Sequence, residues 1–280
     1  MQNLLRDRGD ELTALEREQI QQLLRRIPPH IHDELEQIWY LMDIVWDEFG
    51  CDNKKLNWDN IDKFYRHPVW LLNGLFVEHH ELSMQHREAI SEWVTERGEV
   101  SKILDYGGGA GTLAVALARK KACLQVDIYE PHPMEYAIRR VSSYSNVRFV
   151  NHIPELSYDA LVSTDVLEHV PDPLKVFGEM ITAVKRGGYL IIANNFYPVI
   201  KCHLPRTFHL RYTFNLFARL MGLVVVGPLH GSHATVFRKV SCRSAAPLLV
   251  RSFEMLSMQF FWLASLIKPV VRPLRNCIGK

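Results

Sequence analysis

One short stretch of this sequence combines residue types that suit a ligand-binding loop: residues 104–112, LDYGGGAGT. It places four glycines within five positions, directly after an acidic residue. Glycine inside regular structure costs roughly 0.5–1 kcal/mol relative to alanine, so we expect something to approach this backbone closely. The stretch lacks the lysine of a P-loop, and a dinucleotide fingerprint that starts at Gly107 fails at Thr112. The remaining spacing is D-x-G-x-G-x-G, formed by Asp105, Gly107, Gly109 and Gly111.

Other polar residues stand where apolar runs end. Glu130 ends the run 124–130, and a carboxylate in that place accepts hydrogen bonds from both hydroxyls of a ribose. The run 158–164 ends in Ser163-Thr164 and is followed by Asp165 and, in LEHVPDP, by His169. Open α/β sheets bind ligands at the carboxyl ends of their strands, so we expect these side chains to lie near the glycine loop.

These stretches, together with VKRGGYLIIA at 184–193, resemble four signatures of the class I S-adenosylmethionine-dependent methyltransferases, in the family's order. The resemblance covers about residues 98–240 and implies S-adenosyl-L-methionine as the cofactor. Asn151 and His152 stand where the family often has an aspartate near the adenine. The cofactor-binding residues that the resemblance implies are Asp105, Tyr106, Gly107, Gly109, Gly111, Glu130, Pro131, Asn151, His152, Thr164 and Asp165.

The chemistry of this cofactor suits the glycine loop. The glycines let the backbone approach its methionine and ribose portions, and Asp105 supplies negative charge for its ammonium group. The helix expected to start near Gly111 offers unpaired N–H groups to anionic groups. The catalytic candidates are His169 and Asp165. A histidine at this position of related enzymes is catalytic, contacts the cofactor or caps the loop, and the sequence leaves these three roles open.

The acceptor is expected to be a small molecule, a metabolite or natural product. The stretch around Asp165 lacks the Asn/Asp-Pro-Pro-Tyr/Phe sequence associated with methylation of nucleobase and glutamine amines, so it resembles the small-molecule branch. We expect no nucleic-acid partner. Aromatic faces attract a sulfonium by ~0.5–2 kcal/mol, although aromatic residues equally form helical cores. The acceptor-site candidates are Tyr65, Trp70, His79, Asn195 and Tyr197.

Two other functions fit the same residues. A methyltransferase-like enzyme can cyclise the aminobutyrate chain of S-adenosylmethionine itself, which gives azetidine-2-carboxylate and methylthioadenosine. A non-catalytic subunit with the methyltransferase fold is the second alternative. The product separates the first alternative from methyl transfer, and the intact glycine loop with Glu130 argues against the second.

The elements that position these residues follow from apolar periodicity. Residues 1–98 predict a helical lid and acceptor subdomain, with helices within 12–29 and 32–50 and two more within 65–94. Residues 99–240 alternate short apolar runs with helical patterns. This predicts an α/β fold, a Rossmann-like class I methyltransferase sheet of parallel strands with a C-terminal antiparallel hairpin. One helix is expected over 172–188, with Asp172 as N-cap, Pro173 at its first position and Gly187-Gly188 as its stop.

Residues 241–280 predict a C-terminal amphipathic helix. Its apolar seam repeats at alternating spacings of four and three residues, which suits packing within the subunit or a homodimer; the seam is Leu249, Phe253, Leu256, Phe260, Leu263 and Ile267. The uncharged segment 255–267 is too short to span a bilayer, so no integral membrane segment is expected.

Composition and residue spacing argue against several classes of function. The formal net charge is +2, which does not suggest a nucleic-acid binder. Five cysteines without a C-x-x-C pair argue against a disulfide framework and a cysteine-built zinc site. The pairs His79-His80 and His230/His233 lack a third ligand of diagnostic spacing, so no metal is expected. The N-terminus has no apolar run of signal-peptide length, and we predict a cytoplasmic protein.

Overall fold

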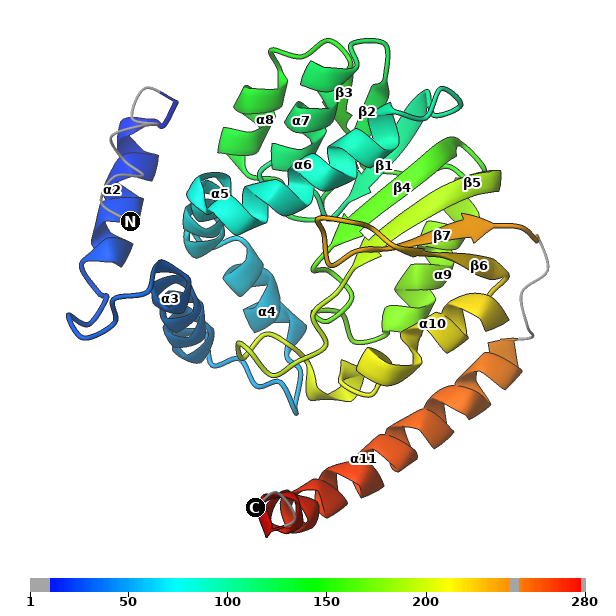
Figure 1. The fold of residues 1–280 in the computed structure, drawn as a ribbon. Coiled ribbons are helices and arrows are strands. Elements are labelled where there is room, and N and C mark those ends of the chain that lie inside the picture. Colours follow the sequence, from blue (N-terminus) through cyan, green and yellow to red (C-terminus); the bar gives the residue numbers. More distant parts are fainter. Residues whose placement is uncertain (1–10, 242–246, 278–280) are drawn as a thin grey trace.

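The computed structural model of this chain describes residues 11–241 and 247–277, with side chains up to residue 263. A single seven-stranded sheet forms its centre, with the strand order β3-β2-β1-β4-β5-β7-β6 (Figure 1). The strands are β1 Lys102–Tyr106, β2 Gln125–Tyr129, β3 Val147–Phe149, β4 Tyr158–Thr164, β5 Val184–Ala193, β6 Leu223–Pro228 and β7 Thr235–Lys239.

Strand direction follows the expectation. β1 to β5 pair in parallel, and β7 runs antiparallel to both β5 and β6. The predicted α/β fold with a C-terminal antiparallel hairpin is therefore confirmed. Because the first five strands are parallel, their carboxyl ends, which carry the predicted ligand residues, meet at one edge of the sheet.

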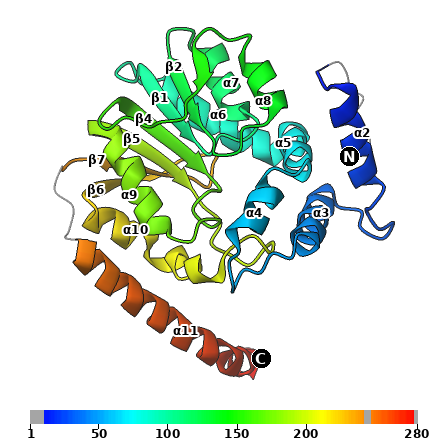
Figure 2. The ribbon, with the colours of Figure 1, turned by 180° about the vertical axis from the view of Figure 1, so that it is seen from behind.

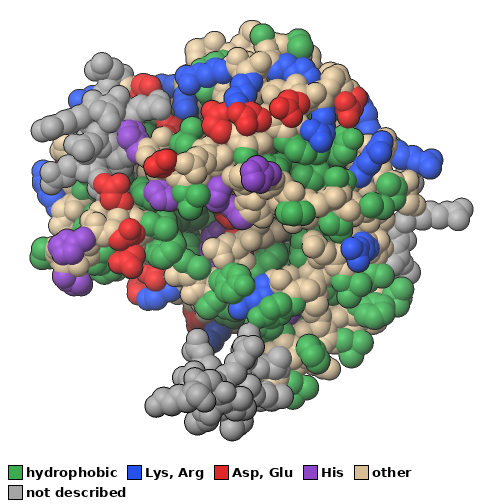
Figure 3. Space-filling view, in the orientation of Figure 1, with side chains coloured by type: hydrophobic (Ala, Val, Ile, Leu, Met, Phe, Trp, Pro, Cys, Tyr) green, Lys and Arg blue, Asp and Glu red, His purple; other side chains and the backbone are tan. Residues whose placement is uncertain are grey.

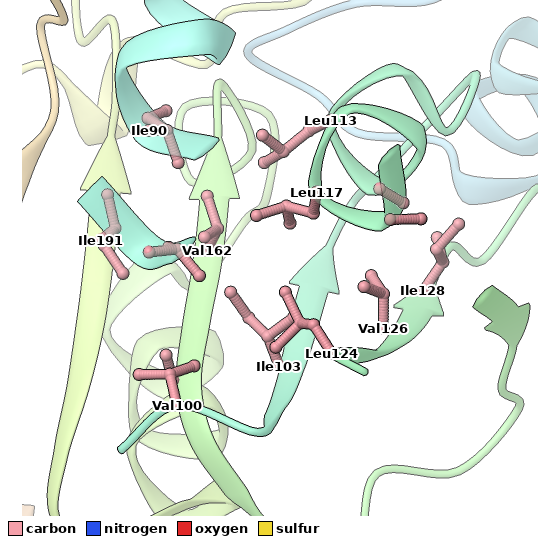
Figure 4. Close-up of a cluster of buried hydrophobic side chains, with 14 of the residues drawn as sticks. Ile90, Val100, Ile103, Leu113, Leu117, Leu124, Val126, Ile128, Val162 and Ile191 are labelled. Atoms are coloured by element: carbon pink, nitrogen blue, oxygen red, sulfur yellow. The ribbon is translucent and has the colours of Figure 1, made fainter. Parts of the chain in front are cut away.

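Helices cover both faces of the sheet (Figures 1 and 2). One face carries α6 Glu81–Thr95, α7 Thr112–Lys120 and α8 Glu135–Val141, and the other carries α9 Pro173–Ala183 and α10 Leu210–Leu220, which follows the turn η1 Pro205–Thr207. Figure 4 shows the first face's core, where Ile90 from α6 and Leu117 from α7 pack on Val162 and Ile191 of the sheet.

The N-terminal helices form a separate hydrophobic core beside the sheet. They are α2 Ala14–Leu24, α3 Glu34–Glu48, α4 Trp58–Tyr65 and α5 Val69–His79. The sequence patterns predicted α2, α3, α5 and α6, but not α4. This core includes Tyr136 from α8 and Cys202 from the segment after β5, so two segments of the sheet domain pack against it. The domain boundary at residues 98 and 99 remains a prediction, and Ile90 and Val94 of α6 already belong to the core of the sheet.

One predicted helix end is wrong. Asp172 caps α9 by accepting a hydrogen bond from the Lys175 backbone N–H, and Pro173 is the first helical residue, as expected. The helix ends at Ala183, however, and Gly187-Gly188 lie inside β5. A Cβ at Gly188 would stand 2.5 Å from the Asp159 carbonyl oxygen, so this glycine permits close approach to β4 and does not stop a helix.

The predicted C-terminal helix is α11, Pro247–Cys277. Its seam does not pack within the described part of the subunit: Leu249, Phe253, Leu256, Phe260 and Leu263 are all at least 40% exposed, and Ile267 lies outside the described side chains. The helix instead buries Val250 and Glu254. Among the described helices, none has both the length and the apolar run that a membrane crossing requires.

Candidate cofactor and acceptor site

The glycine loop joins β1 to α7 at the carboxyl edge of the sheet, and its glycines meet two needs, close packing and positive φ. A Cβ at Gly107 would lie 2.4 Å from Val166 Cγ2, and at Gly108 it would lie 2.8 Å from Asp105 Oδ2. Gly107, Gly109 and Gly111 have φ of 75°, 50° and 74°, the left-handed region that favours glycine. At Gly109 a Cβ would meet nothing within 4 Å, so this glycine leaves space above the loop.

Asp105 lies beneath this loop and is only 2% exposed. Burial raises its pKa to about 7, and the negative charge of Glu130 adds to the rise, whereas Arg87 and a hydrogen bond from the Ala114 backbone N–H oppose it. Its Oδ2 atom is buried without a hydrogen-bond partner. A buried, unpaired carboxylate oxygen requires a donor, and the cofactor's ammonium group is such a donor.

Glu130 follows β2 and holds the loop from its other side. Its Oε2 accepts a hydrogen bond from the Gly109 backbone N–H at 3.1 Å, and its Oε1 accepts one from the His132 backbone N–H at 3.1 Å. Each oxygen keeps a second acceptor position, which suits the ribose hydroxyls. The neighbouring Pro131 is exposed, as are Asn151 and His152, which follow β3.

Tyr106, which the sequence predicted to bind the cofactor, packs its side chain into the core. Its ring is 8% exposed and packs in the core beneath the sheet, with its centroid 5.0 Å from that of Tyr129. It supports the loop through packing, because little of the ring is available to a ligand.

Sequence reasoning missed two residues of the N-terminal helices that reach this loop. Arg87 of α6 lies close enough to lower the pKa of both Asp105 and Asp165 through its charge. Glu78 of α5 accepts a hydrogen bond from Thr112 Oγ1 at 2.8 Å and pairs with Arg140. Both residues are far from the glycine loop in sequence, so no local motif signals them.

The segment after β4 turns sharply at Asp165, whose φ is 54° although it is not glycine. Such a backbone costs about 1–3 kcal/mol and is found most often at functional sites. Thr164 ends β4, and the Asp165 side chain is 46% exposed. Partial desolvation raises the pKa of this carboxyl, but the hydrogen bond and charge of His233 more than offset it, so the pKa lies below its ordinary value.

His233 comes from the turn between β6 and β7, which folds over this edge of the sheet. Its Nε2 lies 3.4 Å from Asp165 Oδ1, and its Nδ1 lies 3.0 Å from Nδ1 of His86 on α6. Figure 3 shows histidines gathered on this face of the molecule, over α5, α6 and the hairpin. The residues form a chain from Asp165 through His233 to His86, which is suited to hold or move a proton.

A second group lies deeper, around Glu168 and His169. Glu168 is fully buried, and burial followed by the charge of Asp165 raises its pKa to about 8. Its Oε1 accepts a hydrogen bond from the Asn195 backbone N–H at 2.7 Å, whereas its Oε2 has no partner. The His169 Nδ1–H donates to the Cys202 carbonyl, and burial lowers the pKa of this imidazole to about 3, so it stays neutral.

This second group also contains the one set of residues, within the described part of the chain, whose donor atoms could hold a metal ion. Ligand atoms of Glu168, His169 and His203 lie within 4.8 Å of one another. The sequence had suggested only the pairs at 79–80 and 230/233 for such a role. A carboxylate with two imidazoles is a donor set that divalent transition metals accept.

Two acceptor-site candidates meet here, in an aromatic cluster. The rings of Tyr65 and Trp70 stack with centroids 5.1 Å apart, and both meet the His169 ring edge-on at 6.3 and 6.1 Å. His132 stacks on the other side of Tyr65 at 5.8 Å. The Tyr65 hydroxyl and the Trp70 Nε1 are buried without hydrogen-bond partners. Buried donors without partners are uncommon in folded proteins, so both groups require a hydrogen-bond acceptor.

The other acceptor candidates do not join the aromatic cluster. The Tyr197 ring is 51% exposed and lies 4.2 Å from the Arg211 guanidinium. The His79 Nδ1–H donates to the Leu75 carbonyl within α5. Asn195 contributes its backbone N–H to Glu168, and its half-buried side chain stays a candidate.

Comparison with known proteins gives a family match that includes the glycine loop and the residues around it. Residues 78–214 match the family model described as a methyltransferase domain. This match and the sheet topology support a class I S-adenosylmethionine-dependent methyltransferase domain over these residues. The matched residues begin in α5 and include Arg87, the glycine loop, Glu130 and the aromatic cluster's His169. The cofactor of this family is S-adenosyl-L-methionine, which the unpaired carboxylate beneath the loop and the open space at Gly109 fit.

Individual relatives agree with this assignment. The chain is 32% identical over 149 residues to a ubiquinone biosynthesis O-methyltransferase of Saccharophagus degradans, covering 48% of this chain and 61% of that protein. For the protein of the same name from Aeromonas salmonicida, the identity is 28%, covering 44% and 55%. The similarity thus spans less than two thirds of these relatives. An O-methyltransferase family protein from Burkholderia thailandensis shares the fold, with a TM-score of 0.51, 17% identity and coverage of 74% and 71%.

Proposed function

We propose that this protein transfers a methyl group from S-adenosylmethionine to a hydroxyl oxygen of a small aromatic acceptor. The observation that carries the proposal is the aromatic cluster of Tyr65, Trp70 and His169, with two unpaired buried donors. His169 and Asp165 follow β4, which pairs in parallel with β1, the strand that leads into the glycine loop. The names of the relatives, which are O-methyltransferases of quinone synthesis, support a hydroxyl on a ring as the target.

The cofactor would be held at several points. Asp105 receives the ammonium group, and its raised pKa falls when that cation arrives. Arg87 supplies the positive charge that suits the carboxylate of the methionine portion, aided by the N-terminus of α7. Glu130 accepts from the ribose hydroxyls, and the space at Gly109 admits the chain between them.

Methyl transfer needs alignment and the removal of one proton. The acceptor oxygen attacks the methyl carbon as the carbon–sulfur bond breaks, and the hydroxyl proton leaves to a base. The sulfonium supplies an activated methyl group, so the protein's task is to exclude water and position the oxygen. We assign proton removal to the Asp165–His233 pair, in which the carboxylate orients the imidazole. His169 remains neutral and orients the ring of the acceptor.

The test is product analysis with matched variants. The purified protein with S-adenosylmethionine and a catechol should form S-adenosylhomocysteine and the methyl ether. Methylthioadenosine from the cofactor alone would instead show cyclisation. Tyr65→Phe removes only the unpaired hydroxyl and should raise the acceptor KM, while Tyr212→Phe, an exposed tyrosine on α10, should leave it unchanged. Cofactor binding without any product from a range of phenols would overturn the proposal.

A further inference from the structure

Many exposed large apolar side chains of the described residues lie on α11. Leu248, Met255, Leu256, Phe260, Trp262 and Leu263 are between 52% and 82% exposed. The helix contacts the body through its opposite side, where Val250 is buried and Ser257 bonds to His209 at 2.8 Å and Thr213 at 3.0 Å. Figures 1 and 3 show this helix standing along the edge of the molecule, with hydrophobic side chains over its first half.

The apolar surface continues onto α10. A groove of about 680 Å³ separates the two helices, lined by Tyr212 and Leu216 on one side and by Phe253 and Phe260 on the other. Tyr212 and Leu216 are 63% and 49% exposed. Arg211 lies at this groove, with its guanidinium 5.1 Å from the Phe261 ring. Exposed patches of this kind mark an interaction surface.

The distribution of side chains around α11 argues against a second copy as the occupant. A two-helix seam is narrow and is normally flanked by charged residues that choose the partner. Here the seam residues Phe253, Leu256 and Phe260 are flanked by Ser252, Val250, Ser257 and Gln259. Leu248, Met255 and Trp262 recur every seven residues outside the seam, and a partner helix would leave them in water.

The charge pattern indicates an anionic surface. After Glu254 the chain has no further acidic residue, but it has Lys268, Arg272, Arg275 and Lys280. Helices that lie in a membrane interface combine Trp, Phe and Leu on one face with Lys and Arg nearby. The 31 residues of α11 form a helix about 46 Å long, which exceeds the ~30 Å apolar core of a bilayer. None of the described helices, however, has the apolar run that is needed to cross that core.

We propose that α11, with the adjoining side chains of α10, is a membrane-contact surface that lies flat on an anionic bilayer. Phe260 and Trp262 enter the boundary between headgroups and acyl chains. The basic residues beyond position 267 attract the anionic headgroups, and Val250 and Ser257 hold the helix to the body of the protein.

Vesicle sedimentation with the full-length protein tests this proposal. Wild-type protein should sediment with phosphatidylcholine vesicles that contain phosphatidylglycerol, more weakly in high salt. The variant F260S/W262S should bind at least about tenfold more weakly. The variant K268Q/R272Q/R275Q should lose at least about tenfold on the anionic vesicles and little on phosphatidylcholine alone. Leu15→Ser, at an exposed leucine of α2, is the matched control and should bind as wild type.

Three results would overturn the proposal. One is the absence of sedimentation with either vesicle while circular dichroism shows a folded protein. Another is a dimer by light scattering that F260S/W262S converts to a monomer, since that would make a second copy the occupant. Equal binding of wild type and F260S/W262S would also contradict it, because the attachment would then lie elsewhere.

Discussion

At the scale of single residues, Gly109 differs from its neighbours in the glycine loop. A side chain there would enter open space, whereas one at Gly107 would strike Val166. We expect Gly109→Ala to cost about 1–2 kcal/mol of stability through its positive φ, and to weaken cofactor binding at least about tenfold. Gly107→Ala should destabilise the fold further, because it adds a clash to the same backbone strain. Urea unfolding and calorimetric titration measure the two effects, and wild-type affinity in Gly109→Ala would contradict the assigned space.

Asp105 lowers the stability of the folded protein, and we expect it to strengthen cofactor binding. Its folded pKa of about 7 lies above the ordinary 3.8, so the unfolded chain ionises first and stability falls as pH rises from about 4 to 7. The ionised carboxylate then costs at most about 4 kcal/mol above pH 7. Asp105→Asn should therefore stabilise the cofactor-free protein at pH 8 and flatten this pH dependence, as thermal unfolding would show.

The same substitution should weaken cofactor affinity about 10- to 150-fold, because a charged hydrogen-bond partner of the ammonium group is lost. Glu130→Ala should have an effect of similar size through the ribose hydroxyls. If Asp105→Asn is less stable than wild type at pH 8 and its cofactor affinity is unchanged, the carboxylate stabilises the glycine loop and does not bind the cofactor.

At the scale of elements, Asp159 of β4 binds groups at the start of β1 and on β5. Its carboxylate accepts hydrogen bonds from the Ser101 and Lys102 backbone N–H groups and pairs with Lys185 at 2.7 Å. Burial raises its pKa, but these partners outweigh burial and lower the pKa to about 2. Because the folded pKa is depressed, the stabilisation is present above about pH 4 and is lost as pH falls towards 2.

Asp159→Asn should accordingly lose about 2 kcal/mol of unfolding free energy at pH 7. The difference from wild type should shrink between pH 4 and pH 2, since wild type loses the same interaction there. Denaturant unfolding at several pH values measures this. Asp47→Asn, which touches an exposed pair with Lys201, is the control and should change stability little.

The sequence predicted those elements whose signals are local. The run 158–164 is β4 residue for residue, and Asp172 with Pro173 starts α9 as expected. The end of α9 was wrong, because Gly188 is required by the nearby Asp159 carbonyl and not by a helix stop. Arg87 and His233 were beyond sequence reasoning, since their place beside Asp165 depends on how α6 and the β6–β7 turn pack together.

At the scale of the whole molecule, the N-terminal helices are joined directly to the cofactor loop. A Cβ at Gly74 of α5 would lie 2.7 Å from the Ala110 Cβ, so the helix backbone rests on the loop. Glu78 binds both Thr112, the first residue of α7, and Arg140 of α8. Tyr65 of α4 stacks on Trp70 of α5, so the aromatic cluster is connected to the loop through α5. Cofactor binding to the loop should consequently stabilise these helices as well.

This coupling predicts that S-adenosylmethionine protects residues 60–80 from limited proteolysis in the full-length protein. Glu78→Gln removes the charge that faces Arg140 in a site where the two side chains are 1% and 11% exposed. The loss of the counter-charge of Arg140 should then cost about 3–5 kcal/mol of stability, and the protection should weaken together with cofactor affinity. Glu81→Gln, at an exposed position at the start of α6, should preserve both. If protease cleaves 60–80 equally with and without the cofactor in wild type, the helices are only packing elements, because a lid must respond to the ligand that it covers.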